Sequence, residues 1–102
     1  MTLSRRLYFD RFCLDTAAEL VRDGDHAVTL KPKAFRVLRH LVEHAGELVT
    51  KDQLLDAVWP DVNVGDAVLK VAVAEIRDAL GDDADRPRFI ATVHRRGYRF
   101  VA

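Results

Sequence analysis

The chain has 102 residues, with 16 Lys and Arg against 16 Asp and Glu, so its formal net charge is zero. This length predicts a single domain, 1–102, that is large enough to bury a hydrophobic core. A hydrophobic fraction of 49% excludes a disordered chain. No long apolar run and no signal-peptide pattern is present, so no membrane contact is expected. The single cysteine, Cys13, excludes an internal disulfide and fits a cytoplasmic location.

The zero net charge hides an uneven distribution of charges along the chain. Residues 1–65 carry nine basic and ten acidic side chains, and residues 66–85 carry two basic and six acidic ones. Residues 86–102 carry five arginines and no acid, which gives this segment a charge of +5. Five arginines without acidic neighbours favour an anionic partner over a merely solvated surface. Net charge alone therefore does not exclude DNA as a partner.

The N-terminal segment, 1–30, is predicted to form a small antiparallel sheet. Its first apolar runs are too short for helices and are separated by Asp10 and Arg11. Two further apolar runs flank Asp23-Gly24-Asp25, and the glycine can adopt the positive φ that a tight hairpin turn needs.

Two helices are predicted next. The first begins at Pro32, which suits the first helical turn, buries one apolar face and ends at Gly46. Thr50 and Gln53 have the spacing of a capping box, so a second helix is expected to begin there. It ends at about Val58, because a proline follows shortly afterwards.

A third helix completes the predicted three-helix core, 31–81. We expect the Asp66 carboxylate to cap this helix and Gly81 to end it. One stripe of apolar side chains recurs along it at helical spacing: Leu69, Ala72, Val73, Ile76 and Leu80. Residues 88–102 are then predicted to form a hairpin. Strands, three helices and a hairpin in this order describe an α+β winged helix-turn-helix, with the hairpin as the wing.

Five short stretches carry a resemblance to a known family: LKPKAF (30–35), LVTKDQLL (48–55), VWP (58–60), EIRDAL (75–80) and VHRRGYRF (93–100). In this unbroken order they resemble the DNA-binding domain of bacterial OmpR/PhoB-type transcriptional regulators. The resemblance implies sequence-specific binding of double-stranded DNA for transcription regulation. It implies that the third helix enters the major groove and that the wing also binds DNA. A domain of this type at the start of a chain resembles those of one-component regulators.

The resemblance assigns DNA contacts to the outer face of the third helix and to the wing. On the helix, Lys70 suits a guanine or a phosphate, and Val71 and Ala74 suit thymine methyl groups. Helical spacing leaves open whether Arg77 or Asp78 also faces away from the core. On the wing, Arg95 or Arg96 suits a narrow minor groove. The predicted DNA-binding residues are Lys51, Ala67, Lys70, Val71, Ala74, Arg77, Thr92, His94, Arg95, Arg96 and Tyr98.

Alternatives to several of these assignments stay open. Lys51 fits an ordinary solvated lysine equally well, and Tyr98 fits a core residue. Glu75 departs from the arginine-rich recognition helices of response regulators, so fewer base contacts are expected. The main alternative function is a winged helix that binds another protein and not DNA, which the zero net charge favours.

Further expectations concern partners and chemistry. The resemblance implies contact with RNA polymerase through the loop between the second and third helices: Asp61, Val62, Asn63 and Val64. A monomer in solution is expected, with a dimer on DNA as an open alternative. His40 and His44 lie one helical turn apart, but only Glu43 or Glu47 is near in sequence as a third ligand, so no metal site is predicted. No cofactor and no set of catalytic residues is predicted either.

Overall fold

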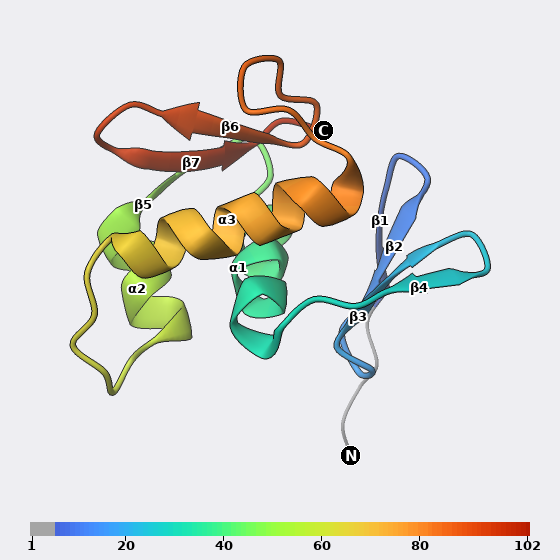
Figure 1. Ribbon diagram of the computed structural model, residues 1–102, viewed down its shortest axis with the longest axis horizontal. Helices are drawn as coiled ribbons and strands as arrows, with labels where there is room; N and C mark the ends of the chain where they lie inside the picture. The colour runs from blue at the N-terminus through green and yellow to red at the C-terminus, as the bar shows by residue number, and fades with distance from the viewer. Residues whose placement is uncertain (1–5) are drawn as a thin grey trace.

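The computed structural model describes residues 6–102 and arranges them as two antiparallel sheets and three helices (Figure 1). In chain order the elements are β1 (Arg6–Phe9), β2 (Phe12–Asp15), β3 (Leu20–Asp23), β4 (His26–Val28), α1 (Pro32–Glu43), β5 (Leu48–Thr50), α2 (Lys51–Val58), α3 (Ala67–Leu80), β6 (Ile90–Val93) and β7 (Gly97–Phe100). The first five residues of the predicted N-terminal sheet segment, 1–5, lie outside the described residues. The predicted α+β order of strands, three helices and a hairpin is confirmed. None of the described helices is long and apolar enough to cross a membrane.

The N-terminal sheet is a meander in the order β1-β2-β3-β4, and it packs beside the helices (Figure 1). Leu14 on β2 is paired with Val21 on β3, and both side chains are fully buried. Gly24 has a φ of 61°, which is the positive value predicted for the hairpin turn. Asp15 is buried, and its carboxylate accepts the backbone N–H groups of Ala17 and Ala18 at 3.1 Å.

The first two helices begin where the sequence predicts. α1 starts at Pro32 but ends at Glu43, so Gly46 lies in the turn that follows and does not itself end the helix. The capping box of α2 is complete. Gln53 N–H donates to Thr50 Oγ1 at 3.1 Å, and Thr50 N–H donates to Gln53 Oε1 at 2.8 Å.

α3 has the predicted buried stripe and the predicted end, but not the predicted cap. Gly81 ends the helix in the left-handed conformation, with a φ of 70°. The Asp66 side chain makes no capping hydrogen bond, so that prediction is wrong. Asp66 itself has helical dihedral angles, whereas a capping side chain needs an extended backbone to reach the following amides. Its carboxylate instead accepts from Lys51 Nζ at 3.2 Å.

A cluster of phenylalanines joins the N-terminal sheet to the base of the C-terminal hairpin. Phe9 packs edge-on against Phe89 and Phe100, with ring centroids 5.8 and 5.0 Å apart. Phe12 packs against Phe89 in the same way at 5.5 Å. Aromatic pairs in this geometry add to the stabilisation that area burial provides. The hairpin is therefore anchored at its base to the first sheet.

The hairpin belongs to a three-stranded sheet in the order β5-β7-β6, in which β5 is a strand that the sequence does not predict. Gly97 begins β7 and faces Thr50 across the strand pair. A Cβ atom at Gly97 would overlap the Val49 carbonyl oxygen and lie 2.8 Å from Thr50 Cα. Glycine is therefore required at this position for the close approach of two backbones.

Asp82, just after the end of α3, holds the start of β6 in place through hydrogen bonds. Its carboxylate accepts backbone N–H groups from Arg88 at 2.7 Å and from Ile90 at 2.9 Å. Burial alone would raise the pKa of Asp82, but these backbone hydrogen bonds outweigh burial and lower it. One residue of the acidic loop is thus a structural anchor for the hairpin.

The Asp82→Asn variant is expected to lower the free energy of unfolding by about 1–2 kcal/mol at neutral pH, because it weakens charge-assisted hydrogen bonds. Because the pKa of Asp82 is lower in the folded state than in the unfolded chain, its ionised form stabilises the native state at pH values above the ordinary pKa of an aspartate. This stabilisation is lost as the pH falls through the lowered pKa. The variant should therefore show a weaker loss of stability in acid, measured by urea denaturation across pH. Asp85→Asn removes the same charge and is the control; equal effects in the two variants would contradict the anchor role.

Candidate nucleic-acid interface

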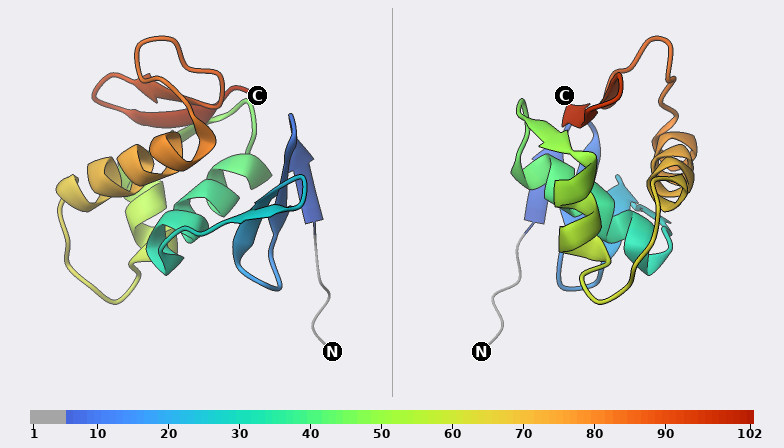
Figure 2. Two further views of the ribbon diagram at one scale, coloured as in Figure 1. Left: turned by 45° about the vertical axis from the view of Figure 1, so that its right-hand side comes forward. Right: turned by 90° about the vertical axis from the view of Figure 1, so that its left-hand side faces the viewer.

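The outer side of α3 and the wing lie next to each other on the molecule. We use wing for β6, β7 and their connecting turn, His94–Arg96. In Figure 1, α3 crosses the front of the molecule and the wing runs above it, with the turn toward the end where α3 begins. The right-hand view of Figure 2 shows α3 at the edge of the molecule, with its outer side uncovered by any other described element.

Four predicted residues of α3 are exposed on this outer side: Ala67, Lys70, Val71 and Ala74. Val71 is 66% exposed, which is unusual for a large apolar side chain. Two alanines keep the surface of the helix flat, so another surface could approach its backbone closely. Lys70 supplies a positive charge and makes no ion pair with the rest of the described chain.

The end of β6 and the wing turn present exposed polar and basic side chains. Thr92, His94, Arg95 and Arg96 are all exposed. Arg95 has a φ of 65°, a left-handed conformation that costs free energy in any residue except glycine. The Arg96 carbonyl accepts the Lys51 N–H at 3.1 Å, so the tip of the wing is tied to the start of α2.

The side chain of Arg77 is turned toward the wing. Its Nη2 donates to the Ile90 carbonyl at 2.8 Å and to Thr92 Oγ1 at 2.9 Å, so the guanidinium joins α3 to β6. Its Nε is buried and finds no acceptor in the described part of the chain. Of Arg77 and Asp78, between which helical spacing does not decide, Asp78 is the exposed residue and Arg77 is half-buried.

Tyr98 and Lys51 also have intramolecular roles. Tyr98 is 6% exposed, which agrees with the core interpretation that the sequence left open. Burial raises the pKa of Tyr98, the charges of Arg77 and Lys51 oppose this shift, and Asp66 adds to it. Lys51 Nζ is paired with Asp66, and an exposed pair of this kind is weak enough to exchange for another anion.

The five arginines of residues 86–102 do not form one patch. Arg88 pairs with Asp10 of the N-terminal sheet at 3.6 Å. Arg86 lies in the loop after α3, and Arg99 is exposed in the middle of β7. Only Arg95 and Arg96 lie in the wing turn, so the segment charge of +5 overstates the charge of the tip.

The loop between α2 and α3 and the histidine pair of α1 lie outside this surface of α3 and the wing. In the loop between α2 and α3, Val62 is 56% exposed and Val64 is half-buried. His40 and His44 stack with ring centroids 4.4 Å apart. Burial lowers the pKa of His40, and the charge of His44 lowers it further. Among residues 6–102, no three His, Cys, Asp or Glu side chains gather closely enough to hold a metal ion.

Comparison with known proteins places this geometry in context. The family described as "Transcriptional regulatory protein, C terminal" matches residues 25–100. Transcriptional regulator HilA of Salmonella typhimurium is 37% identical over 97 residues, which are 95% of this chain and 17% of HilA. Transcriptional activator CadC of Escherichia coli is 36% identical over 81% of this chain and 16% of CadC. The chain thus spans about a sixth of the length of these relatives.

A solved structure shows the same fold. The crystal structure of the Klebsiella pneumoniae RstA DNA-binding domain in complex with RstA box superposes with a TM-score of 0.84 at 30% identity. The superposition covers 95% of this chain and 97% of that one. The winged helix-turn-helix predicted from the sequence is therefore confirmed.

Replacing Arg77 by methionine keeps most of the side-chain stem but removes both hydrogen bonds to β6. The free energy of unfolding is expected to fall by about 1–3 kcal/mol, because the Ile90 carbonyl loses a charged donor. Lys70→Met removes the same charge from the exposed side of α3 and should change stability by less than about 0.5 kcal/mol. Urea denaturation measures both variants, and amide hydrogen exchange of β6 should speed up only in Arg77→Met. Equal, small effects in both variants would contradict a bridging role for Arg77.

Proposed function

Because the chain belongs to the family of C-terminal domains of transcriptional regulatory proteins, with the OmpR/PhoB-type winged helix fold, we propose that it binds double-stranded DNA sequence-specifically to regulate transcription. The prediction that the domain is not an enzyme agrees with this family, whose members are transcription regulators. The observation that carries the proposal is the uncovered side of α3 next to a wing turn with two exposed arginines.

The proposed role of α3 is to read base edges in the major groove, which has the width of one helix. Ala67 and Ala74 let the helix approach the bases closely, because neither side chain projects far. Exposed Val71 suits a thymine methyl group, and Lys70 suits guanine or a phosphate oxygen. This contact set is small, so the wing is expected to supply much of the affinity.

The proposed role of the wing is to place Arg95 or Arg96 in the adjacent minor groove, where a narrow A·T-rich groove attracts arginine. Exposed Thr92 and His94 suit phosphate oxygens on the way to the groove. The hydrogen bond from Arg77 fixes the Thr92 hydroxyl, which then has a proton to donate to a phosphate. Lys51 is a secondary phosphate contact that needs release from Asp66. Tyr98, which is buried, and Arg77, whose guanidinium is bonded to β6, are left out of the proposed contact set.

Three further proposals concern the polymerase contact, the oligomeric state and the location of the protein. The loop Asp61–Val64 is proposed to contact RNA polymerase, for which exposed Val62 offers an apolar point. The isolated domain is proposed to be a monomer in solution that can pair on DNA. The proposed location is the cytoplasm, on the nucleoid.

The experiment that tests the function measures binding of duplexes selected from a random library, across a range of salt concentrations. Arg96→Ala should weaken binding and reduce the slope of log affinity against log salt by about one, if this arginine neutralises one phosphate. Arg95→Gly should weaken binding while leaving stability within about 1 kcal/mol, since glycine relieves the left-handed strain at this position.

Arg86→Ala is the matched control for the wing variants, because it removes an exposed arginine that lies outside the wing turn. Unchanged affinity and slope in both wing variants would remove the wing from the interface. A wild-type domain that binds no duplex even at low salt would favour the protein-binding alternative.

A further inference from the structure

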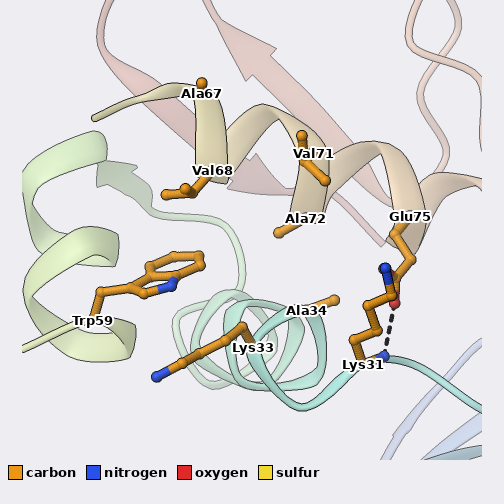
Figure 3. A pocket seen from close by; sticks show the side chains of 9 residues that line it. All are labelled: Lys31, Lys33, Ala34, Trp59, Ala67, Val68, Val71, Ala72 and Glu75. Carbon is orange, nitrogen blue, oxygen red and sulfur yellow. Dashed lines mark hydrogen bonds between the residues drawn. The ribbon is translucent and has the colours of Figure 1, made fainter. Parts of the chain in front are cut away.

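A pocket of about 300 Å³ lies between α1 and α3, on the side of α3 away from the wing (Figure 3). Its walls are mainly apolar: Ala34 comes from α1, and Val68, Val71 and Ala72 come from α3. The indole ring of Trp59, just after α2, closes one end (Figure 3). A concave apolar site with a few polar groups at its edge is the usual form of a small-molecule site.

The charged groups at this pocket have a positive excess. Lys31 and Lys33, at the start of α1, line it together with Glu75 of α3. The carboxylate of Glu75 is already engaged, since its Oε2 accepts the Lys31 backbone N–H at 2.7 Å (Figure 3). Lys33 Nζ donates to the Val58 carbonyl at 2.8 Å, which uses one of its three protons. The pocket therefore combines an apolar interior with cationic donors at its edge.

From this combination we propose that the pocket binds a small organic anion, with an unbranched or flat apolar body and one carboxylate. The body lies against Trp59 and the valines of α3. The carboxylate meets one of the two ammonium groups at the edge, since Lys33 Nζ lies toward Trp59 and Lys31 Nζ lies toward Glu75, at the other end of the pocket (Figure 3). A neutral ligand of the same shape forgoes the charge interaction, and a cationic one is repelled. Val71 also belongs to the proposed DNA-reading side, but ligand binding here does not depend on DNA binding, so the test is done without DNA.

Trp59 is the only tryptophan of the chain, so its fluorescence reports on this pocket alone. Octanoate, octanamide and octylammonium are titrated against the protein as probes of similar size and three charges. Octanoate is expected to give a saturable change, with the neutral and the cationic probe binding about tenfold more weakly or worse. Equal binding of the three probes, or no saturable change with octanoate up to about 10 mM, would overturn the proposal.

The charge requirement is tested with two double variants, one at the start of α1 and one further along it. Lys31→Gln with Lys33→Gln should weaken octanoate binding by about tenfold and abolish its advantage over octanamide. Arg36→Gln with Arg39→Gln removes the same charge from side chains that do not line the pocket, and should leave binding unchanged. Equal losses in both double variants would overturn the pocket assignment. Thermal unfolding verifies that each variant folds, and the comparison of the three probes on the unaltered chain stands independently of the variants.

Discussion

The hydrogen bonds from Arg77 to β6 favour one orientation of the wing relative to α3. Hydrogen bonds to the Ile90 carbonyl and to Thr92 Oγ1 join two elements that an irregular loop separates in sequence. A partly buried guanidinium with an unsatisfied Nε has a desolvation cost. The hydrogen bonds to the wing offset that cost only if β6 stays close to α3, so the side chain favours one relative orientation of the two elements.

Two further contacts hold the wing along its length. At its base, Asp82 accepts the backbone N–H groups that begin β6, and Phe89 packs among the phenylalanines of the first sheet. At its tip, the Arg96 carbonyl accepts the Lys51 N–H. A wing held at its base, middle and tip can present two arginines at a constant distance from α3. Rigid placement of this kind lowers the entropy lost on binding, and it lets a chain of zero net charge direct a local positive charge at a polyanion.

Much of this fold could be predicted from local patterns in the sequence. The capping box at Thr50, the apolar stripe of α3 and the stop at Gly81 each depend on neighbours within a few residues, and all three predictions are confirmed. The missed strand β5 has three residues, which is too short for a periodic signal. The need for glycine at position 97 is equally hidden in the sequence, because it depends on the pairing with Thr50 and on the nearby Val49 carbonyl, which are distant in the chain.

The candidate site was harder to predict, because the orientation of some of its side chains depends on elements that are distant in the sequence. Helical periodicity predicts which side of α3 faces the core, but it cannot show that β6 covers the flank where Arg77 lies. In the same way, Asp66 has the residue type of a cap, yet Lys51 from another helix attracts its carboxylate. The exposed set Lys70, Val71, Arg95 and Arg96 was predicted because exposure follows from local spacing and from the hairpin turn.

The joint action of α3 and a rigid wing can be tested by following backbone amide chemical shifts while a selected duplex is added to the ¹⁵N-labelled domain. Binding should shift the amides of residues 67–78 and 92–96 together, with one common dissociation constant, and leave those of β1–β4 in place. Shifts confined to the N-terminal sheet, or to α3 without the wing, would contradict a single interface built from both elements.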